Sequence, residues 1–122
     1  MTMLDQRLAG DPADSSSDDT PSGVVPTILE AIVRKLCVRA TYNRGTALPA
    51  PHILYTRHDV LHIDAVTLLR DGKPPREEKI ATYRLSGLSD VTRTDTGFVP
   101  SALFEPEAER YEGTALMAVE RD

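Results

Sequence analysis

The sequence is poor in cysteine, aromatic residues and long apolar runs. It has one cysteine, Cys37, no tryptophan, and aromatic residues at only 5% of its 122 positions. One cysteine excludes an internal disulfide and favours a reducing compartment. No stretch approaches the roughly 18 apolar residues of a membrane span, and the N-terminus lacks the basic and apolar regions of a secretory signal. We therefore expect a cytoplasmic protein with no membrane partner.

The motifs that carry most enzymatic chemistry are also missing. There is no glycine-rich phosphate loop, no paired cysteine and no His-Glu-x-x-His. His52 and His62 with Asp64 suggest a metal pair, but two histidines and one carboxylate lack a fourth ligand. Histidines bonded to the backbone are the better interpretation. We expect a non-enzymatic protein with no cofactor and no metal.

The charge is unevenly distributed along the chain. The first 25 residues carry five Asp and one Arg, and the last 22 carry six acids and two Arg. Residues 26–100 hold eleven Lys or Arg against eight acids, which gives a body with a charge of +3. That charge is too small to hold duplex DNA by electrostatics alone. It suits a small anionic ligand or a short single strand.

The composition and charge of successive stretches divide the chain into three parts. Residues 1–25 are rich in Asp, Ser and Pro, which predicts a disordered acidic tail. A core domain is predicted at 26–104 and an acidic C-terminal segment at 105–122, with a short helix at 106–111. Residues 115–119 are either a last strand or a tail that pairs with a partner.

Within the core domain, one helix precedes several strands. Pro26 opens a stretch of about ten residues with apolar side chains at helical spacing. Alternating or apolar stretches, separated by turn residues, then predict strands at 37–42, 48–55, 60–69, 77–85 and 89–94. This order predicts a mainly β fold with one N-terminal helix, as a small SH3-like or Sm-like curved barrel.

A strip of polar side chains follows two of the predicted strands. His62 and Asp64 alternate outward on one strand, Thr82 and Arg84 do so on the next, and His52 lies on the strand before. An arginine fork and stacking rings suit an anion or a nucleobase. The alternative is a solvated sheet face, which antiparallel sheets often have.

The same stretch resembles the WYL domain family over residues 27 to 98. The resemblance rests on PHILYTR, LHIDAV and TYRLSGLSDV, followed by Phe98. The family's Pro-His-x-Leu element, its alanine and its arginine-bearing last strand match Pro51, His52, Leu54, Ala65, Tyr83, Arg84, Leu85 and Leu88. The Trp-Tyr-Leu tripeptide reads Leu61-His62-Ile63 here, and two family arginines are replaced by Ala81 and Gly87.

The resemblance implies an Sm-like barrel that senses nucleotides or nucleic acid and takes part in transcriptional regulation. Such domains usually follow a DNA-binding helix-turn-helix, for which residues 1–26 are unsuited, so a stand-alone, diverged sensor is implied. The ligand-binding residues expected from the strip and the resemblance are His52, Tyr55, Arg57, His62, Lys79 and Arg84. The alternative is an interaction module that forms a homodimer or docks on a DNA-binding partner.

Overall fold

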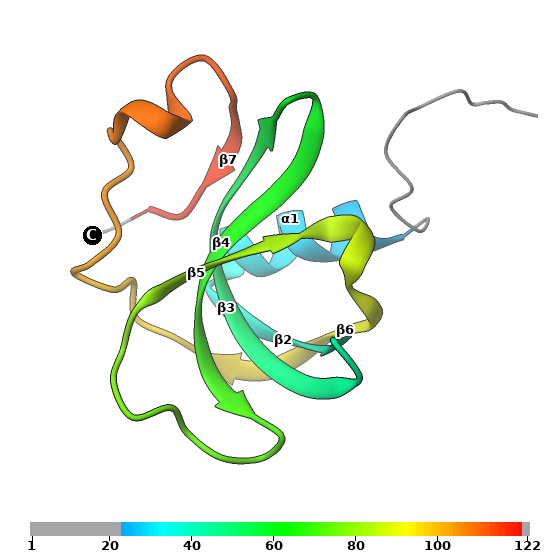
Figure 1. Ribbon diagram of the computed structural model, residues 1–122. Helices are drawn as coiled ribbons and strands as arrows, with labels where there is room; N and C mark the ends of the chain where they lie inside the picture. The colour runs from blue at the N-terminus through cyan, green and yellow to red at the C-terminus, as the bar shows by residue number, and fades with distance from the viewer. Residues whose placement is uncertain (1–22, 121–122) are drawn as a thin grey trace, which may run out of the picture.

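A computed structural model of the protein describes residues 23–120 and shows one helix followed by an antiparallel sheet (Figure 1). The elements in chain order are α1 (Val24–Arg34), β2 (Leu36–Tyr42), β3 (Gly45–Arg57), β4 (Val60–Arg70), β5 (Ile80–Arg84), β6 (Ser89–Gly97) and β7 (Ala115–Ala118). Short 3₁₀ turns at Leu85–Gly87 and Glu109–Tyr111 connect the later strands. The prediction of a mainly β fold with one N-terminal helix is confirmed.

Helix α1 begins at Val24, two residues before the predicted start at Pro26. Proline is tolerated there because the first turn of a helix has amide groups with no helical partner. Both flanking residues adopt left-handed backbone, Gly23 with φ of 89° and Lys35 with φ of 58°. The helix buries Val24, Ile28, Ala31 and Ile32 in the core.

The sheet has the strand order β5-β4-β3-β2-β6, with β7 added beside β3. Strand β3 is long enough to have two partners along one edge, since Ala47 pairs with Ala40 of β2 and Ile53 pairs with Ala118 of β7. Figure 1 shows β7, in red, beside the end of β3 that leads into β4. The expected SH3-like or Sm-like barrel stays a prediction, because β5 and β6 are not paired in the described part of the chain.

Strand β3 is longer than predicted, although it contains Pro49 and Pro51. The sequence predicted a strand over residues 48–55 whose start the two prolines confine to an edge or an irregular entry, because proline cannot donate to a ladder. Register shifts between Leu48 and Pro49, and between Pro51 and Ile53, accommodate both prolines. These shifts are bulges, the places where a sheet accepts proline.

The acidic C-terminal segment is part of the same core rather than a separate unit. The helix predicted at 106–111 is only a single 3₁₀ turn, Glu109–Tyr111. Tyr111 and Val119 are buried, and residues 115–118 form a strand paired within the chain. The disordered tail predicted for residues 1–25 lies almost wholly outside the described residues.

Two opposite faces of the sheet have different roles. Leu54, Ile63 and Tyr83 are neighbours across β3, β4 and β5 and belong to the hydrophobic core. The next cross-strand row consists of Tyr55, His62 and Arg84, and it points to the other face because side chains alternate along a strand. Tyr55 is buried there and still belongs to the core, whereas His62 is half-buried and Arg84 is exposed. Between residues 23 and 120, no helix is both long and apolar enough to cross a membrane.

Candidate functional site

The row of Tyr55, His62 and Arg84 borders an open hollow of about 350 Å³, called here the first hollow. Its lining residues are Arg57, His58, Val60, His62 and Arg84. Within residues 23–120, the guanidinium groups of Arg57 and Arg84 form neither an ion pair nor a hydrogen bond. The first hollow is therefore a cationic surface whose arginines have no internal partner there.

The turn between β3 and β4 brings the cationic side chains of the first hollow together. His58 and Asp59 occupy it with φ angles of 55° and 65°, the positive values of a tight two-residue hairpin. The turn places Arg57 opposite Val60 in the ladder. His58 was predicted as a turn residue and not as a binding residue.

His62 is held on the floor of the first hollow. Its Nδ1 donates to the backbone carbonyl of Val60 at 2.9 Å, and its ring stacks on Tyr55 with centroids 5.9 Å apart. With Nδ1 used by the backbone, Nε2 is the nitrogen available to a further partner. No group of three or more potential metal-binding side chains occurs between residues 23 and 120.

A second hollow of about 350 Å³ adjoins the first through a shared residue, Arg57. Its other lining residues are Tyr55, Ile80, Thr82 and Arg110. Arg110 comes from the C-terminal segment, far from the strands in sequence. We call the three arginines and two histidines that line the two hollows the basic strip; they are Arg57, His58, His62, Arg84 and Arg110.

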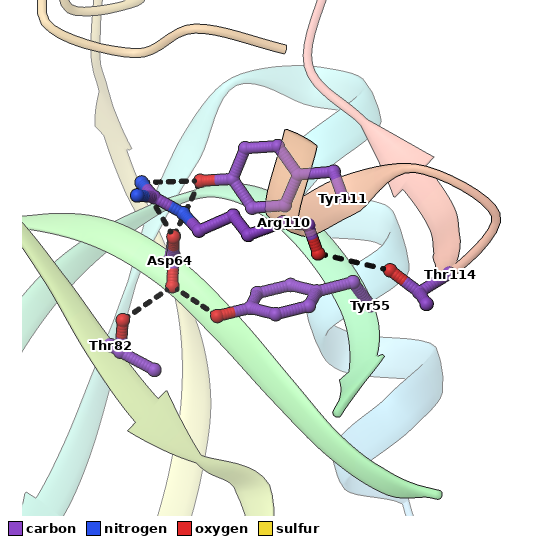
Figure 2. Close-up of polar contacts among 6 residues, drawn as sticks. All are labelled: Tyr55, Asp64, Thr82, Arg110, Tyr111 and Thr114. Atoms are coloured by element: carbon purple, nitrogen blue, oxygen red, sulfur yellow. Dashed lines mark hydrogen bonds and ion pairs between the residues drawn. The ribbon is translucent and has the colours of Figure 1, made fainter. Parts of the chain in front are cut away.

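Beneath the second hollow, a buried carboxylate ties the C-terminal segment to the sheet (Figure 2). Oδ1 of Asp64 accepts hydrogen bonds from Tyr55 Oη and Thr82 Oγ1, both at 2.7 Å. Oδ2 accepts from Tyr111 Oη at 2.5 Å and lies 3.3 Å from a guanidinium nitrogen of Arg110. We call this network the Asp64 clasp.

Asp64 was predicted to alternate outward, and that prediction is wrong. The side chain is fully buried, because Tyr111 and Arg110 cover the polar face at this position. A buried carboxylate needs paired charge and hydrogen bonds, and the clasp supplies both. Alternation correctly grouped Asp64 with His62 and Thr82, but it does not reveal which part of the chain later covers a face.

The two tyrosines of the clasp are held as protonated donors. Burial, followed by the hydrogen bond to Asp64, raises the pKa of Tyr55 to about 12. The same causes raise the pKa of Tyr111 above its ordinary value. The hydrogen bond to Tyr111 is the largest cause that raises the pKa of Arg110. These hydroxyl groups therefore bind Asp64 and do not serve as bases near neutral pH.

His52, expected to bind ligand, is buried under the C-terminal segment and lines neither hollow of the basic strip. Its Nδ1 lies 2.7 Å from the carbonyl oxygen of Ala50, and its Nε2 accepts the backbone N–H of Ser101 at 2.9 Å. The ring stacks on Phe98 with centroids 4.9 Å apart. Like His62, it is bonded to a backbone oxygen, as the metal-free interpretation expected.

The pKa of His52 reflects its buried position. Burial lowers its pKa below the ordinary value, while the hydrogen bond to Ala50 and the charge of Glu78 oppose that shift. Glu78 also accepts a hydrogen bond from the hydroxyl of Ser101. His52 therefore anchors the segment around Ser101 in its neutral form.

The structure brings together some of the other expected residues. Arg57, His62 and Arg84 line the first hollow, and Tyr55 lines the second. Lys79 is exposed before β5 and lines neither hollow. Sequence reasoning missed His58 and Arg110. No local pattern marks Arg110, because it lies in an acidic segment and its relation to Asp64 arises only in the fold.

Comparisons with known proteins leave the chain without a matching relative. No family model, no curated protein and no solved structure matches it. A function is therefore proposed from the residues of the basic strip and from the resemblance in the sequence.

Proposed function

We propose that the protein is a non-enzymatic regulatory domain, WYL-like, that binds a nucleotide or a short single-stranded nucleic acid at the first hollow. One observation carries the proposal. Arg57 and Arg84 line the same open hollow as two imidazole rings, and neither guanidinium is paired within residues 23–120. Cationic groups that converge without an internal partner suit an anionic ligand.

The residue types suit both halves of a nucleotide. A guanidinium offers two parallel N–H donors that fit phosphate oxygens. The imidazole of His62, which is supported from below by Tyr55, offers a flat surface and a free nitrogen to a base. In this proposal Arg57 and Arg84 bind phosphate, and His58 and His62 contact the base or sugar.

A non-catalytic role is supported by the bonding of the groups nearest the second hollow. Tyr55 and Thr82 are the hydroxyl-bearing residues that line the second hollow, and both donate to Asp64, as does Tyr111. The Asp64 carboxylate is itself fully buried. Elsewhere in residues 23–120, the hydroxyl of Ser101 donates to Glu78 beside His52, and both ring nitrogens of that histidine are already bonded to the backbone.

We also propose that the bent sheet is a diverged Sm-like barrel that is open between β5 and β6. Strands β2 to β5 follow one another as antiparallel neighbours, and β6 returns to pair with β2. A 3₁₀ turn, Leu85–Gly87, makes the connection between β5 and β6. A meander whose last strand returns to its first is the connectivity of a small barrel.

Binding measurements on arginine variants test the ligand proposal. Fluorescence anisotropy with labelled single-stranded oligonucleotides, and calorimetry with nucleotides, would give the dissociation constants. Arg84→Gln and Arg57→Gln should each weaken binding about tenfold or more, since a hydrogen bond to a charged group contributes roughly 1.5–3 kcal/mol. Arg44→Gln is the matched control, because it changes an arginine in the turn at the opposite end of β3. Equal affinities for parent and Arg84→Gln would refute the assignment.

The alternative, an interaction module, has its own support at β7. This strand has a partner on one side only, β3, in the described chain, and Leu116 on it is 58% exposed. An open strand edge is a common template for pairing with another chain. Light scattering across a concentration series should then show a dimer that Leu116→Lys weakens. A monomer at every concentration, with no DNA-binding protein captured, would argue against this function.

A further inference from the structure

We infer that the ligand is a nucleotide strand whose consecutive phosphates occupy both hollows, with Arg110 as the second phosphate-binding residue. This inference rests on the proposed function and names its ligand more narrowly. Its structural basis is the continuity of the two hollows at Arg57 and the position of Arg110 at the far side of the second one.

The spacing of the two hollows follows from the sheet register. His62 pairs with Arg84, and Asp64 pairs with Thr82 in the next row on the same face. Residues two apart on one strand are separated by about 7 Å. The two hollows are thus displaced along the strands by a distance of the order of one nucleotide step. A mononucleotide fits one hollow, whereas a dinucleotide reaches from Arg84 to Arg110.

Arg110 is already held in position before any ligand binds. Its Nη2 donates to Tyr111 Oη at 3.0 Å and lies 3.3 Å from Asp64 Oδ2, and its guanidinium lies over the Tyr111 ring. Within residues 23–120 its other nitrogens have no partner, and the side chain is 59% exposed. A guanidinium has five N–H donors, so donors remain for a phosphate without loss of the clasp.

Among residues 23–120, no carboxylate lines either hollow. Asp64 is fully buried beneath the second one and already has four partners. Glu105 and Glu107 line a different hollow with Pro106 and Ala108. Glu109 and Glu112 flank Arg110 in sequence but line neither part of the strip. An anion that bridges the two hollows therefore meets three arginines and no opposing charge in their walls.

The test compares three ligands on the full chain: a nucleoside monophosphate, a 5′-phosphorylated dinucleotide with two phosphates, and tripolyphosphate without bases. We expect the dinucleotide to bind at least tenfold more tightly than the monophosphate. Its affinity should also fall more steeply with salt, because a second phosphate adds a second charge pair that salt screens.

Variants of Arg110 then test whether this residue binds the second phosphate of the dinucleotide. Arg110→Gln should weaken dinucleotide binding about tenfold and bring its salt dependence down to that of the monophosphate, while Arg44→Gln should change neither. The salt dependences of the monophosphate and the dinucleotide are compared on the parent protein. The inference therefore remains testable even if Arg110→Gln does not fold.

Each contrary result has a distinct meaning. Equal binding and equal salt dependence for the monophosphate and the dinucleotide, with Arg84 still required, would overturn this inference and leave the proposed function standing. Tripolyphosphate binding as tightly as the dinucleotide would overturn the assignment to a nucleotide strand. Binding of none of the three ligands would remove the proposed function together with the inference.

Discussion

The backbone N–H of Ser101 donates to Nε2 of His52 at 2.9 Å, so a buried imidazole on β3 holds the chain that leads to β7. The other ring nitrogen lies 2.7 Å from the carbonyl oxygen of Ala50 and takes the proton. Nε2 accepts a hydrogen bond only while it is unprotonated. The attachment of this segment therefore depends on the neutral form of one histidine.

We predict that the protein loses stability as the pH falls below about 6.5, the ordinary pKa of histidine. Burial lowers the pKa of His52 in the folded state, so the unfolded chain binds the proton first. The stabilising contribution is present above the unfolded-state pKa and is lost as pH falls through the folded-state value. Urea unfolding between pH 8 and pH 5 would measure it.

Two histidine variants serve as controls for this pH dependence. His52→Gln should flatten the pH profile, whereas His58→Gln should keep it because His58 is exposed in a turn. A profile of the same shape in the parent and in His52→Gln would assign the titration to other groups.

The Asp64 clasp should be the most sensitive polar site in the protein. Asp64→Ala leaves the buried hydroxyls of Tyr55 and Tyr111 without their acceptor, and we expect a loss of about 2–6 kcal/mol, since each unsatisfied buried polar group costs roughly 1–3 kcal/mol. Tyr111→Phe removes one hydrogen bond to a charged group and should cost about 1.5–3 kcal/mol. Thermal and urea unfolding would give both values.

An exposed acid provides the comparison for the clasp. Asp95→Ala removes an exposed carboxylate from β6, so its effect should stay within about 0.5 kcal/mol. A comparably small effect of Asp64→Ala would mean that the tyrosines find other partners and that the clasp does not hold the segment.

Removal of residues 105–122 should prevent cooperative folding. The deletion takes away β7, which pairs with β3, and the buried side chains of Tyr111 and Val119. Each large apolar side chain contributes roughly 1.5–3 kcal/mol on burial, a large part of the stability of a small domain. Circular dichroism during heating would show the loss of a sharp transition. Leu103→Ala, which shortens an exposed side chain before the cut, should keep that transition.

Cys37 should react slowly while the protein is folded. The thiol is fully buried, and burial raises its pKa to about 11, which leaves little of the reactive thiolate at neutral pH. A thiol reagent should modify one equivalent rapidly in urea and only at the rate of unfolding in buffer. Rapid modification of the native protein would contradict the buried position.

Much of the fold is readable from local patterns. Alternation predicts β4 nearly residue for residue, and His58-Asp59 and Asp71-Gly72 mark two turns because these residue types tolerate left-handed backbone. The pattern fails at His52, where an extra residue between Pro51 and Ile53 interrupts the register. One inserted residue changes which face the following side chains share, and no local signal marks it.

The candidate site is predictable only where strands alone form it. Arg84 and His62 are found by alternation, since both lie on the same face of neighbouring strands. Arg110 is not, because it meets Asp64 through a chain segment that returns 46 positions later in the sequence. The return of this segment to the sheet depends on the packing of Phe104 against Tyr111. In the sequence these two residues are only isolated apolar positions, so no local pattern predicts their contact.

The division of one edge of β3 between β2 and β7 has a consequence for synthesis on the ribosome. The first half of that edge pairs with residues only a few positions earlier, whereas the half around Ile53–Tyr55 waits for residues 115–118. Until those residues emerge, the nascent chain carries unsatisfied amide and carbonyl groups beside apolar side chains, a combination prone to aggregation. A chaperone that shields emerging chains would therefore act on this protein late in translation.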